Sequence, residues 1–178
     1  KHSLKIATVS DLIKYRLKNN KIIKLIQERE FDSEKAKEFK LKIFQNSLSG
    51  EKHYALVKNI IPSEEPKYVR MHKLDITKDI FEEKNIFGDE ISKSLKIIEQ
   101  KGSGALVLIN SNMAPNMQKI FNRRETKDNK LELREYGVGA QILLELGLQK
   151  IILLTNSNKK IIALEGFGLE IISQEKLK

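Results

Sequence analysis

Apolar side chains near the beginning of the chain recur with a roughly helical spacing. They are Leu12, Ile13, Tyr15, Leu17, Ile22, Ile23, Leu25 and Ile26. Side chains three or four residues apart share one face of a helix, and Ser10 is a residue type that caps a first turn. The spacing predicts a helix over residues 9–29, with Asn19-Asn20 as a candidate break. The charged segment 31–40 predicts a linker or a first exposed strand.

Three later segments have the patterns of strands. Phe39, Leu41 and Ile43 alternate with polar residues, which is typical of a half-buried strand. Short apolar runs follow at residues 54–57 and 68–72, with a proline-containing loop between them. Because the connections are short, these segments predict an antiparallel β-meander.

The rest of the chain alternates predicted helices and strands. Helices are expected at residues 89–101, 136–146 and 159–165, and strands at residues 105–109, 150–155 and 169–173. Gly102 and Gly147 follow two of these helices, and glycine is the residue that most often ends a helix. Such alternation indicates a partly parallel sheet covered by helices. The predicted fold class is therefore α/β, with an N-terminal antiparallel β-meander joined to a mixed, partly parallel sheet covered by helices.

The composition is that of a soluble globular protein. Of the 178 residues, 40% are apolar and 32% are charged. No apolar stretch approaches the ~20 residues that span a bilayer, so no membrane partner is expected. The absence of cysteine excludes disulfides and thiolate metal sites and is compatible with a cytoplasmic protein. Since the first residue is Lys1 rather than methionine, we expect a piece of a longer chain.

The net charge of +9 raises the question of nucleic-acid binding. Residues 1–40 carry 11 of the basic residues and 6 of the acidic ones, so the charges are interleaved. Aromatic residues, on which bases stack, make up only 6% of the chain. A solvated lysine-rich surface is therefore favoured, and nucleic acid is not expected as a partner.

Two segments carry side chains that suit a ligand. His72 is followed by oxygen-bearing side chains at Asp75, Thr77 and Asp79. Such a set could hold a metal ion, but with too few further ligands in reach a hydrogen-bonded loop is favoured. Residues 155–160 leave a strand and enter a predicted helix, where α/β sheets bind ligands, and their hydroxyl groups and two lysines suit a phosphate. An ordinary capped loop is an equal alternative.

Two further patterns are less specific. Gly102-Ser103-Gly104 lies after a helix and before a strand, the reverse order of a phosphate loop, so a turn is predicted. Glu132 and Arg134 stand two residues apart on a segment that is predicted to be extended. They indicate a site beside the following helix, although a surface pair is an equal alternative.

These segments together resemble one family. The sequences REYGVGAQIL at 134–143, LLTN at 153–156 and GFGLEI at 166–171, with Leu146-Gly147 and Lys160, resemble the C-terminal half of GTP cyclohydrolase II. The sequences HYALV at 53–57 and VRMH at 69–72, with Thr77 and Asp79, resemble its N-terminal half. The resemblance covers roughly residues 39–174, with a gap after Met117.

The resemblance implies a reaction for which this chain lacks the metal ligands. The family opens the guanine ring of GTP with a zinc-held water, releasing formate and pyrophosphate, and three cysteines hold the zinc. The matching positions are Asp75, Asn85 and Phe87, beside Gly88. A phenyl ring cannot bind a metal and an amide is a weak ligand. We therefore expect no metal here, and without zinc a water keeps a pKa of about 15.7.

Other family positions are partly kept. The family's Arg-Gln-Glu-Gly-Arg loop is matched by residues 110–114, and its guanine-contacting glutamine by Glu90. By resemblance, Arg134 falls on the arginine nucleophile and Glu132 on the acidic proton acceptor, as vestigial catalytic positions. GTP-contacting positions are matched by Arg70, Thr155 and Lys160. These three are the expected residual contacts of a nucleotide or phosphate.

The first residues resemble a different enzyme. Residues 1–5 and 8–16 are similar to the tail of 3,4-dihydroxy-2-butanone 4-phosphate synthase, which is often fused ahead of the cyclohydrolase. This implies an upstream synthase domain as partner in the same chain, with magnesium as its cofactor, and a homodimer. Residues 1–30 are accordingly assigned to the synthase tail and a linker helix, and residues 31–178 to the cyclohydrolase II-like domain.

Three functions remain open on this basis. The favoured one is a catalytically degenerate cyclohydrolase-like domain that supports or regulates the synthase. The second is a working GTP cyclohydrolase II that uses another metal or none. The third is a phosphate- or nucleotide-binding module unrelated to riboflavin, or a nucleic-acid-binding one.

Overall fold

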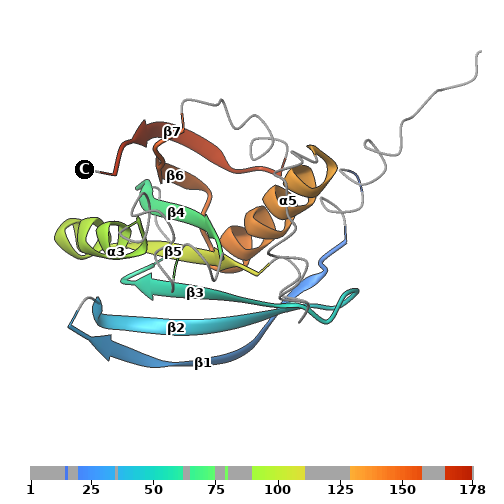
Figure 1. Ribbon diagram of the computed structural model, residues 1–178, viewed down its shortest axis with the longest axis horizontal. Coiled ribbons are helices and arrows are strands. Elements are labelled where there is room, and N and C mark those ends of the chain that lie inside the picture. Colours follow the sequence, from blue (N-terminus) through green and yellow to red (C-terminus); the bar gives the residue numbers. More distant parts are fainter. Residues whose placement is uncertain are drawn as a thin grey trace, which may run out of the picture.

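The structure is a computed structural model of the chain (Figure 1). It describes residues 15, 20–34, 36–61, 65–74, 79, 90–110, 129–157 and 167–177, with the side chains of residues 129–134 outside the description. The predicted helix at 159–165 and the residues Asp75, Asn85, Phe87 and Lys160 lie outside these ranges. So do the N-terminal segments on which the synthase resemblance rests, Tyr15 apart.

One seven-stranded sheet organises the described residues. Its strand order is β1-β2-β3-β5-β4-β6-β7. The strands are β1 (Ile23–Ser33), β2 (Ala36–Asn46), β3 (Lys52–Lys58), β4 (Lys67–Lys73), β5 (Gly104–Ile109), β6 (Lys150–Leu154) and β7 (Glu170–Glu175). The sheet is mixed: β1, β2, β3 and β5 pair antiparallel in that order, whereas the pairs β4–β5, β4–β6 and β6–β7 are parallel. The predicted α/β class with a mixed, partly parallel sheet is confirmed.

The meander prediction is right for its first strands and wrong for the last. Strands β2 and β3 form the expected antiparallel pair. Strand β4 was expected beside β3, but β5 occupies that position and pairs with both of them. The reason is that β5, whose residues 105–107 are fully buried, fills the middle of the sheet and displaces β4 by one place.

Two described helices cover opposite faces of the sheet. Helix α5 (Asn129–Glu145) packs with Ala105, Val107 and Ile109 of β5, whereas α3 (Glu90–Lys101) packs with the intervening Leu106 and Leu108. Successive side chains of a strand point to opposite faces, so the two clusters are the two faces of one sheet. The prediction of helices over the sheet is confirmed for these two. Helix α3 ends at Lys101 and is followed by Gly102, whose φ of 75° is a left-handed conformation that favours glycine.

The beginning of the described chain is a strand and not the predicted helix. Residues 23–33 form β1 and pair with β2 in a long hairpin, at the lower edge of the sheet in Figure 1. The helix prediction for residues 23–29 is therefore wrong. The spacing of the apolar residues is compatible with a helix and with a strand, and the pairing with β2 stabilises the strand. Strand β1 also crosses the predicted domain boundary at residue 30. The assignment of residues 1–30 to a synthase tail stays a prediction.

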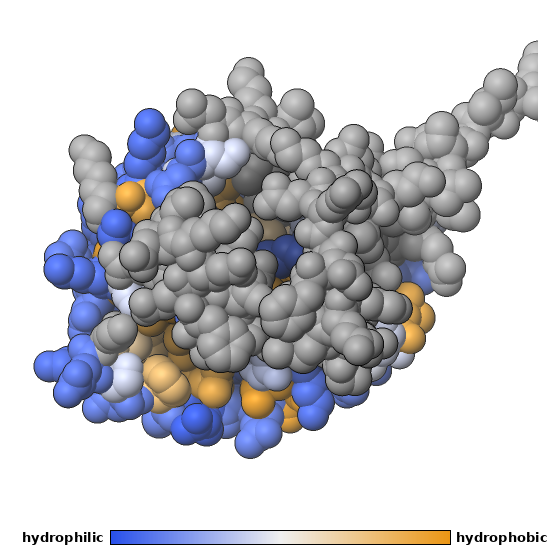
Figure 2. Space-filling model, viewed as in Figure 1, coloured by the Kyte–Doolittle hydropathy of each residue, from blue (hydrophilic) through white to orange (hydrophobic). Residues whose placement is uncertain are grey.

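The surface of the hairpin is largely polar. Apart from Ile23, the residues of β1 are exposed or half-buried, and Figure 2 shows mostly hydrophilic residues with a few hydrophobic ones at this lower edge. Leu25 and Ile26 contribute exposed apolar side chains at an irregularity in the pairing of β1 with β2. Across the described segments, no helix combines the length and apolar character needed to span a membrane.

Candidate functional site

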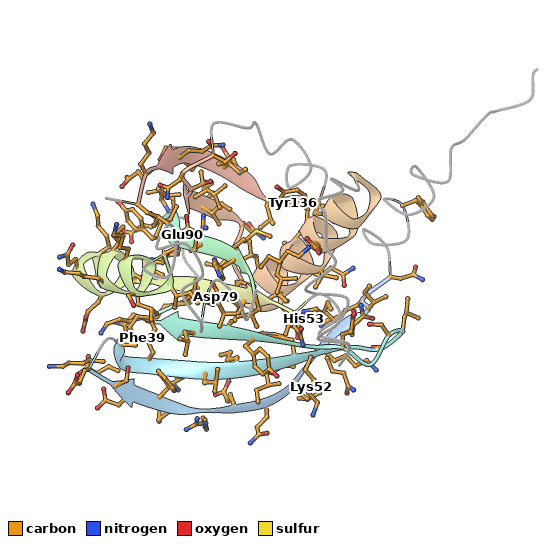
Figure 3. The ribbon with its side chains drawn as sticks, in the orientation of Figure 1. Phe39, Lys52, His53, Asp79, Glu90 and Tyr136 are labelled. Carbon is orange, nitrogen blue, oxygen red and sulfur yellow. The ribbon has the colours of Figure 1, made fainter. Side chains whose placement is uncertain are left out.

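The best candidate site lies where parallel strands end. Strands β4, β5 and β6 run parallel, so their carboxyl ends meet at one edge of the sheet. Helix α3 leads from β4 to β5 and begins with Glu90 at this same edge. In open α/β sheets this edge is where ligands bind. Figure 3 labels Glu90 at the start of α3 and Asp79 over the central strands.

The register of the sheet determines which side chains face this region. Arg70 and His72 of β4 pair in register with Leu106 and Leu108 of β5. Residues paired in register point to the same face, so Arg70 and His72 lie on the face that α3 covers. Their neighbours Val69 and Met71 belong to the α5 side. Strand β4 therefore has an apolar face toward α5 and a face toward α3 that carries a guanidinium and an imidazole group.

Arg70 is fully engaged at the end of its side chain. Its Nη2 donates a hydrogen bond to Oε2 of Glu90, and its Nη1 donates to the main-chain oxygen of Leu154 at 3.1 Å. The two charged side chains of this ion pair are only 13% and 15% exposed. Arg70 Nε is buried and has no hydrogen-bond partner among the described atoms. The sequence correctly singled out Arg70, but its interaction with Glu90 was not predicted.

The carboxylate of Glu90 accepts hydrogen bonds from side chains in different parts of the fold. Besides Arg70, the side-chain amide of Asn156 donates to its Oε1 at 3.1 Å, and Nδ1 of His72 lies 3.8 Å from its Oε2. Asn156 is the second residue after β6, so the ends of strands β4 and β6 and helix α3 all meet at this carboxylate. The sequence analysis included Asn156 in the candidate segment 155–160 but did not predict its hydrogen bond to Glu90. Its place immediately after a buried parallel strand was the available signal.

His72 is held by a second carboxylate. Its Nε2 lies 2.9 Å from Oδ1 of Asp79, and both side chains are about nine-tenths buried, at 10% and 8% exposure. This contact joins the two described ends of the segment 72–79, and because residues 75–78 lie outside the description, the expected hydrogen-bonded loop stays a prediction. Asp75 and Thr77, the other members of the candidate metal set, lie outside the described ranges.

Thr155 uses its hydroxyl within its own loop. The Oγ1 atom accepts a hydrogen bond from the main-chain N–H of Ser157 at 3.1 Å, as in an ordinary capped turn. The N–H of Thr155 donates to the main-chain oxygen of Glu175 at 2.8 Å. The N–H of Leu177 in turn donates to Oδ1 of Asn156. The chain after β7 therefore packs across the end of β6, next to the Glu90 carboxylate.

The predicted catalytic positions fall in a helix. Helix α5 begins at Asn129, so Glu132 and Arg134 stand in its first turns. The expectation of an extended segment is wrong, because the helix starts seven residues before the predicted Tyr136. The roles of Glu132 and Arg134 stay predictions, since their side chains lie outside the described ones. The nearest described ion pair joins Lys73 Nζ to Oε1 of Glu135, at 2.6 Å.

The turn prediction at residues 102–104 is supported by hydrogen bonds. Ser103 Oγ donates to the main-chain oxygen of Asn59, and Asn59 Nδ2 donates to the main-chain oxygen of Gly102. This turn lies at the amino end of β5, away from the site. At the other end of that strand, Asn110 N–H donates to Nδ1 of the buried His53, which Figure 3 labels near the start of β3. No local pattern of residues singles out His53, which entered only through the family resemblance of residues 53–57.

The residues of this chain do not fit a zinc ion of the cysteine-bound kind. The sequence has no cysteine. In the part of the chain that the structure describes, no group of three His, Asp or Glu side chains is placed to hold a metal. Arg70 Nη2 and His72 Nε2 instead contact the carboxylates of Glu90 and Asp79, so these side chains are hydrogen-bonded to acidic residues of the chain.

Three comparisons relate this chain to known proteins. A GTP cyclohydrolase II family model matches residues 24–176. The riboflavin biosynthesis proteins RibBA of Chlorobium phaeovibrioides and of Aquifex aeolicus are each 34% identical to this chain; the alignments cover 100% of the chain and 47% and 48% of those proteins. The crystal structure of RibBX from A. baumannii, a two-domain 3,4-dihydroxy-2-butanone 4-phosphate synthase, superposes with a TM-score of 0.71 at 27% identity. It covers 98% of this chain and 46% of that one.

The chain therefore spans about half the length of the curated relatives that it matches. The family model covers most of the chain, including every strand from β2 to β7. The same segments carry the sequence likeness and the shared fold. On these grounds the chain belongs to the GTP cyclohydrolase II family.

Proposed function

We propose that this chain is a catalytically degenerate GTP cyclohydrolase II-like domain of a riboflavin-biosynthesis protein. In this proposal the active part is an upstream 3,4-dihydroxy-2-butanone 4-phosphate synthase domain, and the present domain supports or regulates it. The observation that carries the proposal is the absence of cysteine from the whole sequence. The family's zinc chemistry needs thiolates that this chain cannot supply.

The chemical reason is the nucleophile. A zinc ion lowers the pKa of a bound water from about 15.7 to about 7, which makes hydroxide available at neutral pH. With Asp75, Asn85 and Phe87 at the three ligand positions, only one side chain is a good metal ligand. By resemblance, the family's arginine is kept at Arg134 and an acidic residue at Glu132, but neither side chain generates hydroxide from water. Retaining them therefore does not restore hydrolysis of the guanine ring.

The ion pair of Arg70 supports the same proposal. Arg70 falls on a position that contacts GTP in the family, yet its two terminal nitrogens donate to Glu90 and to the main chain of Leu154. An arginine that is paired with a carboxylate has less capacity to hold a phosphate. Arg70, Thr155 and Lys160 are the residual positions that we propose for a nucleotide or phosphate, with Arg70 available only where its ion pair with Glu90 is broken.

The similarity to RibBX supports the link to a synthase. That protein is a two-domain 3,4-dihydroxy-2-butanone 4-phosphate synthase, and the present chain matches 46% of it. That description gives one reaction for a protein of two domains. The proposal likewise assigns the reaction to the synthase domain and a supporting role to the present domain. The upstream magnesium-dependent synthase domain, the homodimer and the cytoplasmic location belong to the proposal as well.

The deciding experiment compares the synthase with and without this domain. The longer protein and a version that ends before Ile23 are assayed for butanone phosphate formation and for oligomeric state. We expect the shortened version to be slower or to assemble differently. The matched control is the longer protein with Leu48→Ser, a change at a side chain that is 72% exposed. Equal rates and equal assembly of the shortened and complete proteins would refute the supporting role.

A second experiment tests the degeneracy directly. The purified chain is incubated with GTP and with zinc or magnesium, and formate is measured. We expect no formate above background and no stoichiometric zinc after dialysis. Formate release in proportion to the protein would instead favour an active GTP cyclohydrolase II. Tight, salt-dependent binding to duplex DNA would favour the nucleic-acid alternative.

A further inference from the structure

The carboxylate of Glu90 sits in a cradle of hydrogen-bond donors. Arg70 donates to one of its oxygens and Asn156 to the other, and His72 Nδ1 lies 3.8 Å from the oxygen that Arg70 binds. Glu90 is also in the first turn of α3, where the helix dipole favours negative charge. An anion is therefore stabilised at this point by hydrogen bonds from two side chains, Arg70 and Asn156, and by a helix terminus.

The cradle has the composition of a binding site for a phosphate-containing ligand. A guanidinium, a side-chain amide and an imidazole are typical donors to phosphate oxygens. Arg70 lies in the middle of β4, His72 near its carboxyl end and Asn156 just after β6, beside the sheet edge where α/β sheets bind ligands. One donor of the cradle is unused, because Arg70 Nε is buried and has no partner among the described atoms. The anion now in the cradle belongs to the chain itself.

We infer that Glu90 is a built-in anion that occupies this site and excludes phosphate-containing ligands from Arg70. This inference rests on the proposed function, because it names the reason why a residual phosphate contact is not available in the native chain. A second negative charge within a few ångströms of the Glu90 carboxylate is repelled. Removing that one charge without changing the side-chain shape makes the Arg70 guanidinium available.

The connection to the C-terminal segment strengthens the inference. Asn156 donates to Glu90 with its amide nitrogen and accepts from the N–H of Leu177 with its amide oxygen. Leu177 is only 8% exposed and packs in the cluster that contains Leu95 and Ile98 of α3. Packing on the α3 face therefore helps to hold the amide of Asn156 against the Glu90 carboxylate.

The test measures binding of inorganic pyrophosphate to the 178-residue chain by calorimetry. Pyrophosphate carries the anionic groups of a nucleotide without the base, so the measurement concerns the cradle alone. We expect Glu90→Gln to bind pyrophosphate at least roughly tenfold more tightly than the native chain, from the loss of one repelling charge. The matched control is Glu99→Gln, which removes the same charge from the other end of α3 and leaves the affinity unchanged.

A double variant shows whether Arg70 is the group that is freed. Arg70→Gln combined with Glu90→Gln should return the affinity to the native value. Equal pyrophosphate binding by the native chain and by Glu90→Gln would overturn the inference, and so would an affinity gain that persists in the double variant. Circular dichroism of each variant establishes that it is folded.

A measurement on the native chain keeps the inference testable if Glu90→Gln fails to fold. The side-chain N–H resonances of Arg70 are followed by nuclear magnetic resonance during addition of pyrophosphate. We expect no change, because Glu90 holds the guanidinium. A saturating shift of these resonances at micromolar pyrophosphate would overturn the inference. The proposed function is tested separately by synthase rate and formate release, so a failure of either proposal is recognised without the other.

Discussion

The side chain of Gln141 in α5 accepts a hydrogen bond from the main-chain N–H of Ile23, at 3.2 Å, where β1 begins. The same Oε1 atom accepts from Ile22, and the amide nitrogen donates to the main-chain oxygen of Asn20. Gln141 is only 8% exposed. One side chain therefore provides hydrogen-bond partners for main-chain groups of three residues at the beginning of β1.

Gln141→Leu should destabilise the fold. The substitution leaves main-chain donors of Ile22 and Ile23 unpaired in a largely buried place, which costs about 1–3 kcal/mol. Urea denaturation followed by circular dichroism gives the free energy of unfolding. Gln100→Ala, at an exposed position of α3, is the control and should stay within about 0.5 kcal/mol of the native value. If both variants unfold at the same urea concentration, the anchoring role of Gln141 is wrong.

Arg70→Met should destabilise the chain much more than the loss of a surface charge. It leaves the carboxylate of Glu90 without its main cation in a site that is only 15% exposed. Allowing for the remaining exposure, we expect a loss of about 2–4 kcal/mol in the free energy of unfolding. Lys73→Met is the matched control, because the side chain of Lys73 in the pair with Glu135 is 47% exposed and the pair should contribute less than about 1 kcal/mol. A similar loss in both variants would contradict this account of the Arg70 ion pair.

Two neighbouring glycines should respond differently to alanine. A Cβ atom at Gly104 would collide with the main-chain oxygen of Tyr68 and approach Ile98, whereas a Cβ at Gly102 meets no atom within 4 Å. Gly102→Ala should cost about 1 kcal/mol, for the left-handed conformation alone. Gly104→Ala should cost more than about 2 kcal/mol, because main-chain atoms cannot move aside as side chains do. Thermal unfolding of the two variants shows which substitution lowers the stability more. A smaller loss in Gly104→Ala than in Gly102→Ala would mean that β4 and β5 move apart to accommodate the added Cβ atom.

The pair of Glu28 and Lys42 gives a prediction about pH. These residues face each other across β1 and β2, with Lys42 Nζ 3.0 Å from Glu28 Oε2. The hydrogen bond from Lys42, together with its charge, holds the pKa of the Glu28 carboxyl below its ordinary value of 4.5. A lowered folded-state pKa means that the contribution of this pair is present above pH 4.5 and is lost as the pH falls through the lowered pKa.

The measurement is a carboxyl titration by nuclear magnetic resonance. In Lys42→Met the pKa of Glu28 should rise toward its ordinary value, while Lys37→Met, an exposed change on the same strand, should leave it as it is. The effect on stability should be small, since Glu28 is exposed and salt screens such pairs. An unchanged Glu28 pKa in Lys42→Met would show that Lys42 is not the cause.

The sequence was informative where a segment is buried on both faces. The strands expected at 105–109 and 150–155 and the helix expected at 89–101 are observed with nearly the same bounds. Burial on both faces requires a continuous apolar run, and such a run is visible without knowledge of any partner. The expected strands at 54–57, 68–72 and 169–173 are also confirmed as β3, β4 and β7.

Prediction failed where a partner in space decides the structure. The apolar residues 22–26 suit a helix by their spacing, but pairing with β2 makes residues 23–33 a strand. In the segment before Tyr136, Leu131 and Leu133 alternate with charged residues as in a strand, yet the segment is the first part of α5. Local pattern alone does not distinguish these cases, because the competing free energy comes from contacts with distant residues.

The same limit applies to the candidate site. Arg70 was selected through the family resemblance, and Thr155 through that resemblance and through its place at the end of a strand, where it is observed. The ion pair between Arg70 and Glu90 was not predicted, because it joins side chains from two elements whose relative position depends on the whole sheet. Neither residue type nor spacing indicates that a carboxylate fills the anion position.

The place of β4 in the sheet has a consequence for the order of folding. This strand lies between β5 and β6, and its contact between Arg70 and Leu154 joins positions 84 residues apart. The hairpin of β1 and β2 needs only neighbouring residues, so it can form early, whereas β4 gains its second partner only when the late strand β6 has docked. Parallel pairing over such a separation is slow because the loop must close before any contact forms. During synthesis, the Arg70 edge of β4 therefore stays open until the ribosome has released β6.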